Sequence, residues 1–428
     1  MNSKRGKIFF VLPIVILIFS GCDDFGSSQN EIVEPGEKIT VSGKLVFNFG
    51  YGTDAKVVIQ DETALVDQYG NFTVPNVTLP YDLKLFSLDG REAKVFYGLS
   101  RSNIVINAST DFINGHNSKN AEIITHFDFP LAANQIVKSY FIPDENTEKL
   151  YVVSFHPTNT PWVSTHLQWL HSNSISGKLL LLINTSENGK VLSFDKYYEK
   201  KYTVLADKDI NDTVEMSDPY FDPEEILVSG QLVNNQYPNT TVEMRFIHKN
   251  SEQHSSNEIV QFQHTQAGFE FLMPKFLPAE FTYNIQSAGW GLPFSFRQQI
   301  ISSGLQNVIL DLDPPLELFT PHEYQNLSVY NTEFSWNNGS LEDGIYEVQI
   351  FFTQNQAKIL KIYTTSLKTF IPDLRQYGFS PENNQTIKWY AKKILGFKNL
   401  DEFLEENYYR SNSYEGYNRS LERIATIN

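Results

Sequence analysis

The chain has 428 residues, and its 50 acidic side chains outnumber 34 basic ones, which gives a formal net charge of −16 at pH 7. A protein that binds nucleic acid presents a basic face to the phosphates. No dense Lys/Arg cluster follows the first few residues, so no nucleic-acid partner is expected. The single cysteine, Cys22, excludes an intramolecular disulfide, and the length allows several domains, each stabilised by an apolar core.

The N-terminus has the organisation of an export signal. Residues 4–7 are mostly basic, residues 8–19 form an apolar run, and Ser20 and Gly21 are the small residues that a signal peptidase needs before Cys22. The apolar run is shorter than the about 20 residues of a membrane-spanning helix. A permanent transmembrane anchor is therefore not expected.

This pattern resembles the lipobox of bacterial lipoproteins, although Phe19 stands where that family usually has Leu. The resemblance implies a signal peptide at 1–21, cleavage before Cys22 and acylation of the Cys22 thiol. It also implies a protein anchored by lipid in the bacterial outer membrane, at the cell surface or on the periplasmic face. The alternative is that Cys22 simply follows an ordinary secretory signal or is a buried thiol.

Residues 22–38 are polar or small and contain Pro35-Gly36, so they cannot bury a core and are predicted to be a flexible tether. Fully extended, such a tether reaches about 50 Å. It would hold the first domain clear of a lipid surface.

Beyond the tether, apolar alternation, β-branched and aromatic residues and frequent turn residues predict an all-β chain of tandem β-sandwiches. One segment recurs: Val41–Leu45 (VSGKL) returns as Val228–Leu232 (VSGQL). Each copy continues with a strand and then with a glycine followed by aromatic residues, at Gly70–Phe72 and Gly268–Phe271. The matched order predicts an internal duplication over 39–108 and 223–313.

Both copies resemble the carboxypeptidase regulatory-like domain, a small transthyretin-like β-sandwich. The resemblance rests on the VSGKL and VSGQL openings and on Asp67, Gly70 and Phe72 of the hairpin DQYGNF; the second copy has Thr265 in place of the aspartate. It implies a spacer or binding module without catalytic groups. Physically, the glycine allows a tight turn and the phenylalanine enters the core.

The segment 109–222 between the copies differs in character and is predicted to be a separate β-sandwich of unassigned type. Its expected strands are Leu150–Phe155, Lys178–Ile183 and Val191–Phe194, the last two joined by a hairpin. A third motif of this kind, ISGKL at Ile175–Leu179, lacks the glycine–aromatic hairpin at the right distance and is interpreted as coincidence.

The segment 314–428 resembles a fibronectin type III-like domain of immunoglobulin-like type. The resemblance rests on Trp336 in FSW, on YEVQI at Tyr346–Ile350 and on IKWYA at Ile387–Ala391. Residues Leu400–Tyr409 are predicted to form a short helix capped by Asn399 and inserted before a final strand at 421–427.

No nucleophile elbow, metalloprotease motif, dinucleotide fingerprint, P-loop or zinc spacing occurs in the chain, so no catalytic residue is assigned. Asp207, Asp209, Asn211 and Asp218 occupy positions 1, 3, 5 and 12 of a calcium loop. The glycine at the sixth position and the flanking helices are missing. We therefore favour a solvated loop and retain Ca²⁺ binding as the alternative hypothesis.

Two tryptophans are candidate ligand-binding residues. Trp290 lies between two glycines and is expected in a loop, and Trp162 is expected at another, where each ring could stack on a sugar or anchor a protein. The chain is thus predicted to be a non-catalytic, lipid-anchored envelope protein that presents β-sandwiches to a protein or glycan ligand. The alternatives are a carbohydrate-processing hydrolase, whose carboxylate pair is distant in sequence, and an accessory subunit of an outer-membrane complex.

Overall fold

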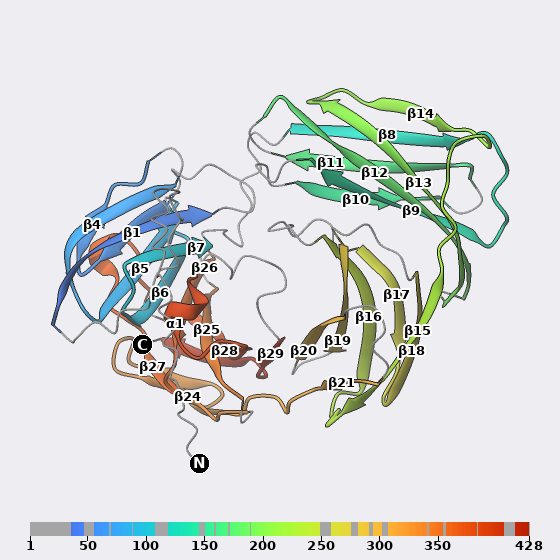
Figure 1. Cartoon of the computed structure of the whole chain (residues 1–428). Helices are drawn as coiled ribbons and strands as arrows, with labels where there is room; N and C mark the ends of the chain where they lie inside the picture. The colour runs from blue at the N-terminus through green and yellow to red at the C-terminus, as the bar shows by residue number, and fades with distance from the viewer. Residues whose placement is uncertain are drawn as a thin grey trace, which may run out of the picture.

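The computed structural model confirms the all-β expectation, because its sheets pack face to face and its helical segments are short. Its strands form four successive sandwiches, coloured in Figure 1 from blue through green and yellow to orange-red. The structure describes residues 36–46, 55–67, 70–87, 89–107, 119–144, 150–157, 160–169, 172–188, 190–248, 258–274, 281–290, 294–301, 307–339, 342–353, 357–382, 384–405 and 416–427.

The first and third sandwiches have seven strands each. The first sandwich contains β1 (Lys38–Val46), β2 (Ala55–Ile59), β3 (Glu62–Ala64), β4 (Asn71–Thr78), β5 (Tyr81–Ser87), β6 (Glu92–Leu99) and β7 (Asn103–Asn107). The third contains β15 (Glu225–Val233), β16 (Asn239–His248), β17 (Glu258–His264), β18 (Gly268–Pro274), β19 (Phe281–Trp290), β20 (Phe294–Ile301) and β21 (Val308–Asp311).

These two sandwiches have the same topology. One sheet has the order β4-β1-β7 in the first sandwich and β18-β15-β21 in the third, with the central strand antiparallel to the first neighbour and parallel to the second. The other sheet runs β3-β2-β5-β6 and β17-β16-β19-β20. The predicted repeat is therefore present in the strand order.

The repeated motifs meet each other inside each sandwich. Gly43 of VSGKL lies opposite Phe72, and Gly230 of VSGQL lies opposite Phe269. A Cβ atom at either glycine would overlap the phenylalanine ring across from it. The glycine and the aromatic residue recur together because the ring lies over the position that a side chain would occupy.

The second sandwich also has seven strands, but one of them changes sheet. The strands are β8 (Lys119–Phe127), β9 (Gln135–Pro143), β10 (Tyr151–Phe155), β11 (Trp162–Trp169), β12 (Ser174–Glu187), β13 (Lys190–Leu205) and β14 (Ile210–Val214). The sheets have the orders β10-β11-β8-β14 and β13-β12-β9. The first strand again pairs with the fourth and, in parallel, with the seventh, whereas the third strand joins the fourth.

The ISGKL motif of this sandwich lies on the fifth strand, β12, and not on the first. Its sequence position therefore does not correspond to that of the two repeats.

The fourth sandwich pairs the sheet β22-β24-β27 with a larger sheet. Its elements are β22 (Leu318–Thr320), β23 (Gln325–Leu327), β24 (Glu333–Trp336), β25 (Gly344–Phe352), β26 (Lys358–Thr364), β27 (Lys368–Phe370), the 3-10 helix η2 (Arg375–Tyr377), β28 (Thr386–Leu395), α1 (Leu400–Phe403), β29 (Gly416–Arg419) and β30 (Arg423–Ile427). Trp336 and Trp389 are fully buried, as core residues of such a sandwich must be.

The predicted insertion was only partly right. The helix begins after Asn399, whose side chain accepts a hydrogen bond from the backbone N–H of Glu402, but α1 ends at Phe403. The remaining predicted helical residues, 406–409, lie outside the described residues. Two strands follow the helix where one was expected, because β29 precedes β30.

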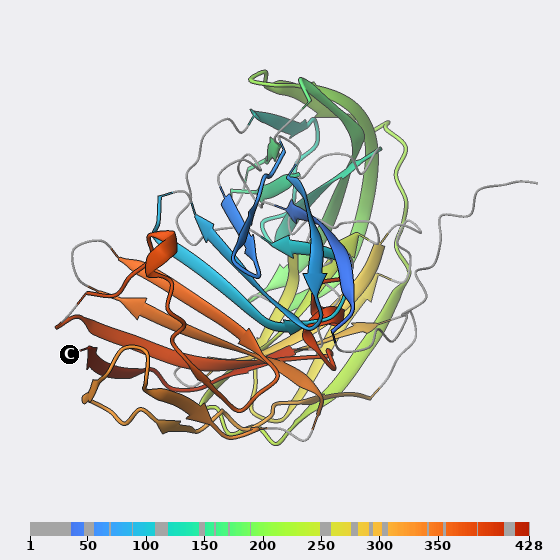
Figure 2. The ribbon, with the colours of Figure 1, turned by 90° about the vertical axis from the view of Figure 1, so that its left-hand side faces the viewer.

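One sheet runs through three of the four sandwiches. Strand β6 of the first sandwich pairs in parallel with β26 of the fourth, and β20 of the third pairs antiparallel with β29 of the fourth. The fourth sandwich therefore lies between the two repeats and joins their sheets (Figures 1 and 2). In both repeats, the sixth strand forms this connection.

The second and third sandwiches share an apolar core instead. Leu179, Leu181 and Ile183 of β12 face the core of their own sandwich, whereas Leu180 and Leu182 pack against the core of the third sandwich. The continuous apolar run Leu179–Ile183 thus reflects burial of both faces of the sheet, which period-2 alternation alone would not produce.

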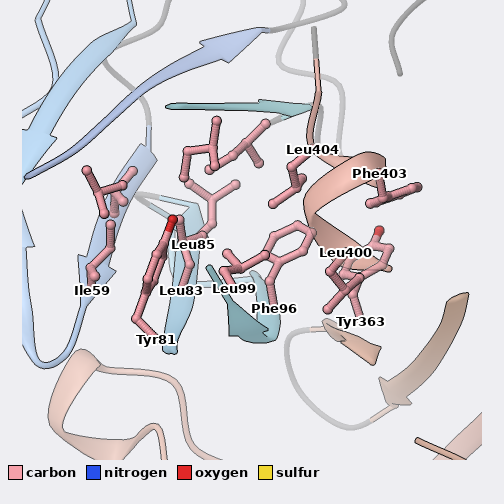
Figure 3. Close-up of a cluster of buried hydrophobic side chains, with 14 of the residues drawn as sticks. Ile59, Tyr81, Leu83, Leu85, Phe96, Leu99, Tyr363, Leu400, Phe403 and Leu404 are labelled. Atoms are coloured by element: carbon pink, nitrogen blue, oxygen red, sulfur yellow. The ribbon is translucent and has the colours of Figure 1, made fainter. Parts of the chain in front are cut away.

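The helix α1 anchors the first sandwich to the fourth. Figure 3 shows Leu400, Phe403 and Leu404 packed with core residues of the first sandwich such as Phe96. The carboxylate of Asp401 accepts hydrogen bonds from the backbone N–H groups of Ser100 and Arg101, at 2.9 and 3.3 Å. The inserted helix therefore contacts another part of the same chain.

No helix in the described part of the chain is both long and apolar enough to span a bilayer.

Candidate functional site

The outer face of the sheet β10-β11-β8-β14 carries one exposed and one half-buried aromatic side chain among the described residues, Phe155 and Trp162. Alternation along the strands directs Val152 and Val163 into the core of the second sandwich, so their neighbours point outward. Among these neighbours, Phe155 is 59% exposed and Val153 is 38% exposed. Large apolar side chains that gather on an exposed surface mark candidate interaction sites.

Trp162 belongs to this face. Its ring centroid lies 6.4 Å from that of Phe155, with the ring planes at 62°. The prediction of a loop position was wrong, because Trp162 is the first residue of β11 and pairs with His126 of β8. A strand position fixes the ring more firmly than a loop would. That rigidity favours recognition, because little side-chain entropy is lost on binding.

Polar groups surround the two rings. His126 and His166 are exposed on the same face. Ser164 lies opposite Phe155 and donates a hydrogen bond to the carboxylate of Glu122. The face therefore combines two aromatic rings with imidazole, hydroxyl and carboxylate groups within three neighbouring strands.

Side-chain bridges hold the edge strand β10 in place beside β9. The backbone N–H of Ser139 donates to Ser154 Oγ at 3.0 Å, and that of Val137 donates to His156 Nδ1 at 3.4 Å. Burial lowers the pKa of His156, although the carbonyl of Thr160 near Nε2 acts in the opposite direction. The neutral imidazole is thus the form that the folded state favours, because Nδ1 must accept a hydrogen bond.

Trp290, the other tryptophan candidate, does not stand in a loop as predicted. It is the last residue of β19 and pairs with Asn239 of β16. The structure describes its backbone but not its side chain, so its proposed role in ligand binding stays a prediction. Cys22 lies outside the described residues, and its acylation likewise stays a prediction.

The acidic residues of the calcium hypothesis make protein contacts. Asp209 accepts a hydrogen bond from the N–H of Glu122 at 3.0 Å, and Asp218 forms an ion pair with Lys200 at 3.3 Å. Asp207 and Asn211 are exposed. Among the described residues, no three His, Cys, Asp or Glu side chains are grouped as a metal site requires.

Lys200 also forms an ion pair with Asp212 at 3.0 Å. Burial would raise the pKa of Asp212, but hydrogen bonds from Tyr202 and Lys200 outweigh it and hold the pKa below its usual value. An ammonium group thus balances the carboxylates of this loop. Calcium binding stays a prediction for titration.

Sequence reasoning missed a buried charged network on the sheet that runs through the first, fourth and third sandwiches. Glu92 of β6 lies 3.6 Å from Lys94 and 3.4 Å from Lys361 of β26, and the three side chains are 2%, 8% and 11% exposed. Burial would raise the pKa of Glu347 on β25, but the ammonium groups of Lys392 and Lys361 hold it below its usual value. The network spans the parallel β6–β26 junction, where it opposes a shifted register.

No known family model matches the chain, and no curated protein matches its sequence. Two solved structures are weakly similar. One is a tetra-tandem repeat from the extending region of a large adhesion protein, at 8% identity and a TM-score of 0.15. The other is a Ca²⁺-stabilised adhesin with which an Antarctic bacterium binds ice, at 8% identity and a TM-score of 0.14.

Each comparison covers 92% of this chain and all of the other chain. TM-scores this low carry no inference about topology or function.

Proposed function

We propose that the chain is a non-catalytic binding protein of the bacterial envelope, tethered by lipid at Cys22, and that the outer face of β10-β11-β8-β14 binds its ligand. The observation that carries this proposal is the pair Phe155 and Trp162, an exposed ring and a half-buried ring whose centroids lie 6.4 Å apart on the outer face of this sheet. Rigid aromatic side chains contribute much of the energy of binding where they are presented in this way.

The chemistry of the face favours a glycan. Sugar rings offer apolar C–H faces to aromatic side chains and hydroxyl groups to polar ones. Phe155 and Trp162 would contact the C–H face of a sugar ring. His126, His166 and Glu122 would donate hydrogen bonds to its hydroxyl groups or accept them. A protein ligand that presents both apolar and hydroxyl groups is the second candidate, and the same variants test it.

A glycan array with the full chain tests this function. Trp162→Ala and Phe155→Ala should each weaken binding about 10- to 100-fold, since loss of an aromatic hot spot costs about 1.4–2.8 kcal/mol. Tyr324→Ala is the matched control, because Tyr324 is 74% exposed on the fourth sandwich, away from this face. Binding that survives both substitutions would refute the assignment of this face.

The lipid anchor has an independent test. Cys22→Ser removes the thiol that acylation requires, so the variant should leave the membrane fraction, whereas replacing the neighbouring Ser27 with Ala should not change fractionation. Membrane retention of Cys22→Ser would refute the anchor without affecting the binding face. The hydrolase and outer-membrane-complex alternatives remain predictions for activity assays and for pull-down from solubilised membranes.

A further inference from the structure

The four sandwiches divide into two halves with separate apolar cores. Two clusters of buried residues combine the first and fourth sandwiches, one cluster combines the second and third, and the remaining cluster lies within the second. Among the described residues, none of these clusters draws members from both halves. We name the first and fourth sandwiches the outer half and the second and third the inner half.

Strands β20 and β29 join the two halves. Their pairing extends over four residue pairs, from Phe294 opposite Arg419 to Arg297 opposite Gly416. Within the outer half, by contrast, β6 and β26 pair between fully buried faces, since both sides of β6 pack against apolar clusters. In the part of the junction that the structure describes, the halves are therefore joined by backbone pairing and polar contacts, and no apolar cluster crosses it.

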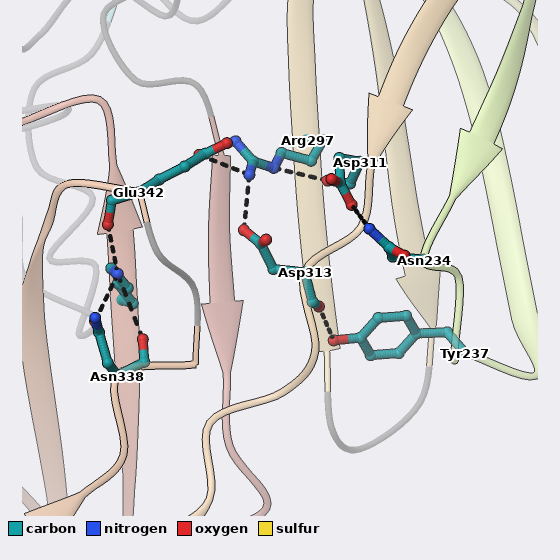
Figure 4. A network of polar contacts seen from close by, with 8 residues as sticks. Asn234, Tyr237, Arg297, Asp311, Asp313, Asn338 and Glu342 are labelled. Atoms are coloured by element: carbon teal, nitrogen blue, oxygen red, sulfur yellow. Dashed lines mark hydrogen bonds and ion pairs between the residues drawn. The ribbon is translucent and has the colours of Figure 1, made fainter.

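Among the described residues, the guanidinium group of Arg297 makes polar contacts with both halves at this junction (Figure 4). Arg297 of β20 donates to the carbonyl of Asp311 at 2.8 Å, to the carboxylate of Asp313 at 2.7 Å and to the carboxylate of Glu342 at 2.7 Å. Asp311 and Asp313 belong to the inner half and its linker. Glu342 belongs to the outer half, so Arg297 connects the two.

The surroundings fix the clasp formed by Arg297, Asp313 and Glu342. Lys393 donates to the carbonyl of Glu342 and to Asn338 Oδ1, both at 2.7 Å, which positions the loop that carries Glu342. The hydroxyl of Tyr237 donates to the carbonyl of Asp313 at 3.0 Å and holds the linker. The Arg297 and Asp313 side chains are 8% and 12% exposed, but the Glu342 side chain is 48% exposed.

The geometry points to a hinge. We propose that the two halves move as rigid bodies about the linker that follows Asp313, and that the Arg297–Glu342 contact of the clasp holds them closed. The Arg297–Asp313 contact lies within the inner half and its linker, is buried and stays intact during the motion. The Arg297–Glu342 contact crosses the junction, is exposed at Glu342 and breaks on opening together with the short β20–β29 pairing. This motion requires neither the lipid anchor nor the glycan-binding face.

Distance measurements between spin labels test the hinge. The chain has one native cysteine, so the full chain with Cys22→Ser accepts labels at chosen sites only. Suitable sites are Leu65 of the outer half, 91% exposed, and Met216 of the inner half, 70% exposed with its backbone N–H bonded to Asp128. The wild-type clasp should give one dominant distance.

Arg297→Gln should raise the ratio of open to closed molecules about tenfold, because it removes the charge-assisted hydrogen bond to Glu342 across the junction. Glu342→Gln removes only the exposed partner and leaves the packing intact, so it keeps the test valid if Arg297→Gln fails to fold. Raising the salt concentration from about 0.05 to about 0.5 M should act in the same direction by screening this pair.

Arg375→Gln is the matched control, because Arg375 pairs with Asp373 and lies over Tyr330, all within the outer half. It should leave the distance distribution unchanged. A distribution that is the same in wild type, in Glu342→Gln and in high salt would overturn the hinge, as would an equal opening in Arg375→Gln.

Discussion

Truncation of Phe403 tests whether the first and fourth sandwiches form one cooperative unit. Phe403 is 1% exposed on α1, and its ring centroid lies 5.3 Å from that of Phe397 and 5.5 Å from that of Tyr363. The same cluster includes core residues of the first sandwich (Figure 3). Phe403→Ala should therefore leave a cavity at the contact between the two sandwiches.

The expected loss in the free energy of unfolding is about 3–5 kcal/mol, the usual cost of a buried Phe→Ala substitution. At about 2–4 °C per kcal/mol, the melting temperature of the affected half should fall by about 6–20 °C. Differential scanning calorimetry measures this directly. The transition of the second and third sandwiches, which share a different core, should stay in place.

Phe370→Ala is the matched control, because the same side chain is removed from the fourth sandwich at a position that is 45% exposed. It should cost less than about 1 kcal/mol. If Phe403→Ala cost no more than Phe370→Ala, or lowered only a transition assigned to the fourth sandwich, the shared core would be refuted.

Two further predictions concern the repeats and the second sandwich. Gly43→Ala and Gly230→Ala should each lower the free energy of unfolding by about 1–3 kcal/mol, because the new Cβ overlaps a buried ring; Gly268→Ala, whose Cβ would lie 3.7 Å from the nearest atom, should cost less in the same urea titrations. Because the folded-state pKa of His156 lies below its usual 6.5, its contribution to stability is present above that value and is lost as the pH falls through the lowered pKa. Urea midpoints should therefore fall more between about pH 7 and about pH 5 in the wild type than in His156→Gln, and an equal fall in both would contradict the role of this imidazole.

Local sequence patterns were sufficient to predict the strand-rich class and the repeat. The alternation in Asn71–Thr78 and the pairing of VSG with a later phenylalanine are short-range signals that survive in the fold. The N-cap at Asn399 could also be predicted from the sequence, because a cap depends only on residues within one helical turn. The length of the helix and the number of strands after it were misjudged.

The joining of the sandwiches was not predictable from these patterns. Strand pairing between β6 and β26 depends on residues distant in the chain, and nothing in either segment alone specifies its neighbour. The run Leu179–Ile183 did carry a signal, because five consecutive apolar residues in a strand indicate burial on both faces. The loop position expected for Trp162 was wrong, because Trp162 begins strand β11.

The helix that reaches back to the first sandwich also has a consequence for the order of folding. Ser100 and Asp401, which it joins, stand 301 positions apart in the chain. The partner strand of β6 is also late in the chain, because β26 spans Lys358–Thr364, so this edge of β6 stays unpaired during synthesis or export until that segment has emerged. An unpaired strand edge is a template for pairing with other chains, so the interval before β26 and α1 arrive is the stage at which the first sandwich is most prone to aggregate.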